Sequence, residues 1–124
     1  MTQKQTFPKT NPLADKSYSF ALNIIKLYKE LVKKEKEYVL SKQLLNSGTS
    51  IGANITEAQG AISNSDFSAK ISIAYKESLE TKYWISLLRD SDYVTRELAK
   101  ELWEQADELS KIMFSILKTT RIHK

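Results

Sequence analysis

The chain of 124 residues contains no cysteine, a single histidine, and only 3 glycines and 2 prolines. The lack of cysteine excludes a disulfide scaffold, a thiolate metal site and a cysteine nucleophile. The few glycines and prolines leave too few turn formers for a many-stranded sandwich or barrel. No apolar run reaches the roughly 18 residues of a membrane-spanning helix, and the first residues, MTQKQTFPKTNP, lack the apolar segment of a secretion signal. We therefore expect a cytoplasmic, helical, single-domain protein that has no contact with a membrane.

The charge balance is mildly basic. Lysine and arginine number 19 against 15 acidic residues, for a net charge of +4 and an isoelectric point near 9.2. A run of lysines between positions 26 and 36 is the densest basic segment. A basic isoelectric point with basic groups gathered on one face is typical of nucleic-acid binders, whereas lysines spread over a solvated helix face carry no function. Both interpretations remain open from the sequence.

Apolar residues recur at steps of three and four positions, which predicts helices. The expected helices cover about residues 12–35, 42–61, 64–91 and 96–120, with Asn11, Ser41, Ser63 and Thr95 as N-caps. Connections this short between long helices imply antiparallel neighbours. We therefore predict an all-α fold, an antiparallel up-down-up-down four-helix bundle over residues 12–120. A disordered or extended arm is expected over residues 1–11, and a basic tail over residues 121–124.

The second expected helix contains an unusual run of small residues, Ser47 to Ala53. Its two glycines, Gly48 and Gly52, each cost roughly 1 kcal/mol in a helix interior, so a loop between two short elements is the alternative. The apolar period runs through the segment without a slip, which favours one continuous helix. The small side chains would then let a neighbouring backbone approach closely.

The third expected helix carries apolar residues over much of its circumference. Ile73, Tyr75, Leu79 and Tyr83 lie away from the main apolar stripe. A helix with this pattern is buried on more than one side. In a chain of this size, we expect one of those sides to form a subunit interface.

One block is more specific than any periodicity. The sequence from Leu44 to Ala61, LLNSGTSIGANITEAQGA, resembles the bacterial four-helix-bundle family of proteins encoded within intervening sequences of the large-subunit ribosomal RNA gene. The segment ESLETKYW, from Glu77 to Trp84, extends the match, which spans about residues 12–117. The residues of this family motif, which we expect to be structural, are Ser47, Gly48, Ser50, Ile51, Ala53, Asn54, Glu57, Glu77 and Glu80.

The resemblance implies properties that composition does not. Family members look like homopentameric bundles arranged as a barrel, and they include accessory proteins of diversity-generating retroelements. Those accessory proteins act beside a reverse transcriptase and bind nucleic acid through basic surface. The family is not one of known enzymes, so the resemblance implies neither catalytic residues nor a cofactor.

The residues themselves give little sign of catalysis. A di-iron site in a helix bundle needs Glu-x-x-His pairs, and the only histidine is His123. Three acids in otherwise apolar or small segments, Glu57, Glu77 and Glu80, would hold a hard cation if they met. The alternative, which we favour, is that they make structural hydrogen bonds. We therefore predict a non-enzymatic protein without a metal or cofactor.

Two functions of different classes follow. The first is an accessory protein that associates with RNA or DNA, with phosphate contacts from Lys26, Lys29, Lys33, Lys34, Lys118, Arg121 and Lys124. Its partners would be further copies of itself, most simply a pentamer, and a reverse transcriptase or other nucleic-acid-processing protein. The second is a protein-interaction scaffold without nucleic-acid binding, which would meet a basic partner through Glu97, Glu101, Glu104 and Glu108.

Overall fold

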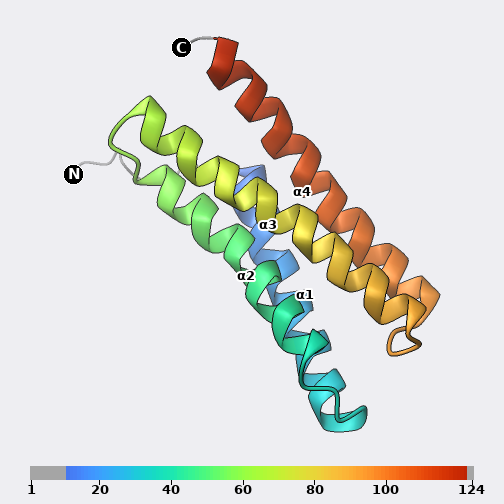
Figure 1. Ribbon diagram of the computed structural model, residues 1–124. Helices are drawn as coiled ribbons and strands as arrows, with labels where there is room; N and C mark the ends of the chain where they lie inside the picture. Colours follow the sequence, from blue (N-terminus) through green and yellow to red (C-terminus); the bar gives the residue numbers. More distant parts are fainter. Residues whose placement is uncertain (1–10, 123–124) are drawn as a thin grey trace.

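The computed structural model describes residues 11–122, with the side chains of residues 11–120. It contains the helices α1 (Pro12–Lys34), α2 (Leu40–Gln59), α3 (Asn64–Asp90) and α4 (Arg96–Ile122). Consecutive helices run in opposite directions and pack against each other (Figure 1). The predicted all-α, up-down-up-down bundle is confirmed. The helix α4 continues to Ile122, into the segment expected to be a tail, and most of the expected N-terminal arm lies outside the described residues.

Three helices begin as the sequence predicts. The side chain of Asn11 accepts a hydrogen bond from the backbone N–H of Ala14 at 3.1 Å, with Pro12 in the first turn. The hydroxyl oxygens of Ser63 and Thr95 accept the corresponding bonds three residues downstream, at 3.0 and 3.2 Å. Each cap satisfies one of the backbone donors that a helix N-terminus leaves unpaired.

The start of α2 differs from the prediction. Ser41 is not the cap, because the helix already begins at Leu40. The carboxylate of Glu37 takes that role and accepts the backbone N–H groups of Val39, Leu40 and Ser41 at 3.2, 3.0 and 2.7 Å. Burial alone would raise the pKa of Glu37, but these hydrogen bonds lower it below its ordinary value. The hydroxyl of Ser41 is buried and donates to the carbonyl oxygen of Glu37 at 2.7 Å.

The small-residue segment is one continuous helix, as predicted. A Cβ atom built on Gly48 would lie 3.0 Å from both Cγ atoms of Ile24 in α1. At Gly52, the nearest atom to such a Cβ is the hydroxyl oxygen of Ser17, also in α1, at 3.4 Å. The two glycines therefore allow the backbones of α1 and α2 to come close together.

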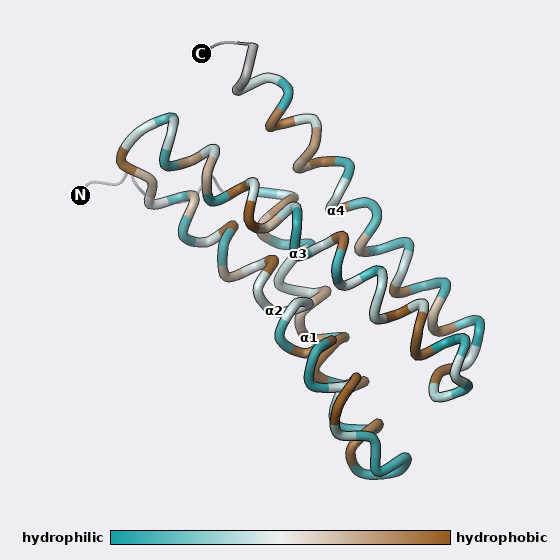
Figure 2. The backbone as a smooth tube through the Cα atoms, in the orientation of Figure 1, coloured by the Kyte–Doolittle hydropathy of each residue, from teal (hydrophilic) through white to brown (hydrophobic). Residues whose placement is uncertain are grey.

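The core consists of one buried apolar face from each helix, and hydrophobic and hydrophilic positions alternate along the described parts of all four helices (Figure 2). Buried hydroxyls cross this core in two places. Thr81 donates to Ser47 at 2.9 Å, and the hydroxyls of Ser78 and Ser110 lie 2.7 Å apart. These pairs join α3 to α2 and to α4, so these four buried hydroxyls find their hydrogen-bond partners within the bundle.

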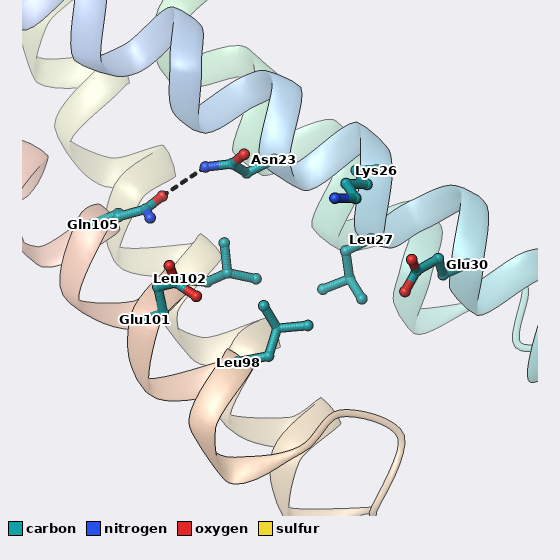
Figure 3. Close-up of a pocket in the computed structure, with 8 residues that line it drawn as sticks. All are labelled: Asn23, Lys26, Leu27, Glu30, Leu98, Glu101, Leu102 and Gln105. Atoms are coloured by element: carbon teal, nitrogen blue, oxygen red, sulfur yellow. Dashed lines mark hydrogen bonds between the residues drawn. The ribbon is translucent and has the colours of Figure 1, made fainter.

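Helices α1 and α4 pack less closely than consecutive helices do. A groove of about 290 Å³ lies between them. Leu27, Leu98 and Leu102 point toward one another across it, and Asn23 donates a hydrogen bond to Gln105 at 3.1 Å (Figure 3).

Candidate nucleic-acid interface

The lysines predicted on α1 form an exposed stripe. Lys26, Lys29 and Lys33 are spaced by three and four residues, which places them on one helix face. Their Cα atoms span about 10 Å along the axis. Lys34 is exposed beside the stripe. None of these four side chains forms an ion pair with another residue in the part of the chain that the structure describes.

Acidic side chains border the α1 stripe. Lys26 shares the rim of the α1–α4 groove with Glu30 on its own helix and with Glu101 on α4 (Figure 3). The carboxylates reduce the positive potential at this edge, so the stripe is a mixed surface rather than a purely basic one.

The C-terminal part of α4 forms a second basic surface. Residues 109–124 contain Lys111, Lys118, Arg121 and Lys124 and no acidic residue. Lys118 is exposed and has no ion pair within the described residues. Arg121 lies in the last turn of α4, and the predicted contact at Lys124 lies outside the described residues.

The two basic surfaces lie at opposite ends of the bundle. The ion pair of 2.8 Å between Lys16 of α1 and Glu108 of α4 shows that these two residues lie at the same height along the bundle axis. From that level, Lys33 lies toward the α1–α2 turn and Lys118 lies in the opposite direction. At about 1.5 Å per residue, they are roughly 40 Å apart along the axis. The sequence prediction grouped these lysines, but within one chain they cannot contact the same short segment of a nucleic acid.

The structure adds residues to the second surface that the sequence prediction did not include. Lys76 of α3 and Lys118 of α4 line one small pocket together with the aromatic rings of Tyr75 and Phe114. Lys76 and Lys118 are far apart in the sequence, so the sequence alone does not show that they line one pocket. The sequence feature that indicated a basic surface here was the absence of acidic residues after Glu108 in α4.

The acidic residues of α4 are exposed, as the scaffold hypothesis requires, but they do not face away from the rest of the bundle. Glu108 pairs with Lys16 of α1, Glu104 pairs with Lys100 at 3.3 Å, and Glu101 lines the α1–α4 groove. Glu97, near the start of α4, is also exposed. The acidic side chains of α4 therefore take part in the contacts between α1 and α4, and their negative charge is partly neutralised within the chain.

Part of the family motif is packed inside the bundle. Ser47, Gly48 and Ile51 are buried between α2 and its neighbours. Asn54 is half-buried and its amide donates to the backbone oxygen of Ser50 at 2.9 Å. Ala53, by contrast, is exposed.

The three motif carboxylates do not meet. Glu57 pairs with Lys70 at 2.7 Å, near the α2–α3 turn. Glu77 and Glu80 lie farther along α3, where burial and then the Glu80 charge raise the pKa of Glu77. Among the described residues, no three histidine, cysteine or acidic side chains are placed to hold a metal ion. The alternative of a cation site formed by these three residues is therefore wrong.

None of the helices in the described region has an 18-residue segment apolar enough to cross a bilayer.

Comparisons with known proteins agree with the fold. A family model described as "23S rRNA-intervening sequence protein" matches residues 9–115. A crystal structure at 1.70 Å resolution, of a protein with unknown function from the S23 ribosomal protein family of Bacteroides thetaiotaomicron VPI-5482, is 50% identical. The match covers 86% of this chain and 98% of that one, with a TM-score of 0.85. No curated protein sequence matches significantly. Neither description indicates an enzymatic family.

Proposed function

The chain belongs to the 23S rRNA-intervening sequence protein family, and on this premise we propose that it is a non-enzymatic, homo-oligomeric accessory protein that associates with RNA. The family description itself refers to an intervening sequence of ribosomal RNA, and the similar crystal structure is assigned to a ribosomal protein family. Both descriptions favour RNA over DNA as the polyanion that the basic surfaces meet.

The observation that carries this proposal is the division of the basic residues into two classes. Six of them form ion pairs within the described part of the chain. Those lysines of the predicted interface that the structure describes do not, and they are exposed: Lys26, Lys29, Lys33, Lys34 and Lys118. An ammonium group without a carboxylate partner is available to replace the counterions of a phosphate backbone.

Oligomerisation is the second part of the proposal. Ile73, Leu79 and Tyr83 on α3 are 44%, 41% and 58% exposed. An apolar helix face of this kind is suited to burial against another copy. In a pentamer, the charge of +4 per chain would sum to about +20 on one particle, which favours association with a polyanion. A reverse transcriptase or another nucleic-acid-processing protein would then be a further partner.

The acidic stripe of α4 does not support a second function as well as the lysines support the first. A scaffold that recruits a basic partner needs unpaired carboxylates, whereas Glu104 and Glu108 already form ion pairs within the chain. Association with RNA is therefore the function that the charge pattern supports better.

The test is a binding titration of a labelled structured RNA against salt, starting at 50 mM. We compare wild type with the triple variant Lys26→Gln/Lys29→Gln/Lys33→Gln. The matched control is Lys16→Gln/Lys70→Gln/Lys100→Gln, which removes the same charge from lysines that are ion-paired. We expect the stripe variant to bind more weakly and to lower the salt slope by up to about one per lysine that contacts phosphate.

The control should change both quantities much less. The proposal fails if wild type does not bind the RNA at 50 mM salt and micromolar protein. It also fails if the two triple variants weaken binding equally, because the effect would then reflect net charge alone.

A further inference from the structure

A pocket of about 130 Å³ lies between α3 and the C-terminal half of α4. Its residues come from the first half of α3, which follows the α2–α3 turn, and from the last third of α4. The α2–α3 turn and the C-terminal end of α4 lie at the same end of the bundle (Figure 1). Its lining consists of two aromatic rings, two lysines, a hydroxyl and one aliphatic side chain, from Ser72, Tyr75, Lys76, Phe114, Leu117 and Lys118.

The aromatic part of this pocket is open to solvent. Phe114 is 48% exposed, although Met113 and Leu117 beside it in α4 are buried. Its ring packs against Tyr75, with the centroids 6.0 Å apart and the planes tilted by 38°. Tyr75 packs on one side of the Phe114 ring. Nearly half of the surface of Phe114 remains exposed to solvent, where a planar ligand can contact it. Every nucleobase has a π-face that can stack on such a ring.

The charged part of the pocket is entirely positive. The ammonium of Lys118 lies 5.9 Å from the centroid of the Phe114 ring, and Lys76 is exposed on the α3 side. Neither lysine has an ion pair in the described part of the chain. The adjoining segments, residues 67–76 of α3 and residues 109–122 of α4, contain no acidic residue. The pocket lining therefore contains no carboxylate, whereas Glu30 and Glu101 line the α1–α4 groove together with Lys26.

From this combination we propose that the α3–α4 pocket binds one unpaired nucleotide, with its base stacked on Phe114 and its phosphate held by Lys76 and Lys118. The inference rests on the proposed association with nucleic acid, and it adds that the α3–α4 pocket recognises unpaired nucleotides. A base within a duplex is stacked on both faces and cannot reach the ring, so the pocket selects single-stranded segments. Nothing in the pocket requires a ribose hydroxyl, so the shared ligand is an unpaired nucleotide of RNA or DNA.

The experiment measures binding of three labelled probes of equal length, an unstructured RNA strand, the same sequence as DNA, and an RNA duplex. Phe114→Ala removes the stacking surface, and Phe114→Trp restores it. Tyr18→Ala is the matched control, because Tyr18 is an exposed aromatic on α1, 69% exposed and outside this pocket. We expect Phe114→Ala to weaken binding of the single strands by roughly 5- to 150-fold, the range for loss of one stacked base.

Phe114→Trp should bind the single strands at least as tightly as wild type does, and Tyr18→Ala should match wild type. Duplex binding should be unchanged in all three variants. Lys76→Gln/Lys118→Gln should weaken single-strand binding and lower its salt slope by up to about two.

Three outcomes would overturn the assignment, and they differ from failure of the proposed function. If wild type binds RNA but Phe114→Ala keeps full single-strand affinity, only the pocket assignment fails. If Phe114→Ala weakens duplex and single strand equally, stacking is not the cause. If light scattering shows that Phe114→Ala changes the oligomeric mass, the ring belongs to a contact between copies. If wild type binds no probe at 50 mM salt, the RNA proposal fails as well.

Discussion

Gly48 and Gly52 occupy successive turns of α2, but the space beside them differs. At Gly48, a methyl group would lie 3.0 Å from two side-chain carbons of Ile24, and the fully buried Ile24 side chain would have to shift to make room for it. At Gly52, the nearest atom would lie at 3.4 Å, an ordinary contact. The close approach of α1 and α2 therefore depends mainly on Gly48.

We predict opposite effects of the two Gly→Ala substitutions on stability. Either alanine gains about 0.5–1 kcal/mol from helix propensity. Overpacking at Gly48→Ala costs about 1–3 kcal/mol, so this variant should be less stable than wild type. Gly52→Ala should be as stable or slightly more stable. Urea unfolding at one protein concentration measures both, and equal stability of the two variants would refute the packing argument.

The contribution of Glu77 to the free energy of unfolding depends on pH. Burial, and then the neighbouring Glu80 carboxylate, raise the pKa of Glu77 above its ordinary value of 4.5. The folded state therefore binds this proton more tightly than the unfolded state does, and stability is lost as pH rises through the raised value. Glu77→Gln should be more stable than wild type at pH 7, and the advantage should disappear once both states are protonated at acidic pH.

Thermal unfolding at pH 7 and near pH 3 tests this prediction. Glu97→Gln, at an exposed position of α4, is the control and should show a smaller effect. A Glu77→Gln variant that is less stable at pH 7 would mean that the ionised carboxylate makes a favourable contact instead.

At the scale of the helical elements, the side chain that caps the start of α2 comes from the α1–α2 turn, at Glu37, and not from Ser41. Lys36 has a left-handed backbone with φ of 56°, and the next residue, Glu37, turns its carboxylate onto the first backbone N–H groups of α2. A negative charge at a helix N-terminus is stabilised by the helix dipole as well as by hydrogen bonds.

We predict that Glu37→Gln lowers the free energy of unfolding by about 1 kcal/mol at neutral pH. Because the pKa of Glu37 is lowered in the folded state, its contribution is present above the ordinary value of 4.5 and is lost as pH falls through the lowered value. The difference from wild type should therefore shrink in acid. Glu35→Gln, two positions earlier and exposed, is the control, and an equal loss in both variants would contradict a specific capping role.

The helices and most of their ends were predictable from the sequence, because the signals are local. Asn11, Ser63 and Thr95 each accept a bond from a residue three positions away, and the apolar period carries α2 through its glycines. Glu37 was not recognised, because its role depends on the turn made at Lys36. Likewise, Phe114 and Lys76 lie 38 positions apart in the sequence and meet only because α3 and α4 pack antiparallel.

At the scale of the whole molecule, the fold changes the meaning of the charge pattern. The candidate lysines of α1 and of α4 were predictable as exposed basic residues, but their separation to opposite ends follows from the topology of the bundle. One chain thus presents a mixed stripe on α1 and, toward the other end, a pocket whose lining contains no carboxylate. An assembly of several copies would repeat both surfaces around one particle, which is how a modest charge per chain would suffice for a long polyanion.

The most direct test of an RNA-associated homo-oligomer is light scattering on a size-exclusion column, with the pure protein mixed with a structured RNA at 50 mM and at 500 mM salt. For five copies of a 14.2 kDa chain, we predict a protein mass of about 71 kDa at both salt concentrations. RNA should co-elute at 50 mM and be released at 500 mM. A protein mass near 14 kDa, with RNA eluting separately even at 50 mM salt, would contradict the account.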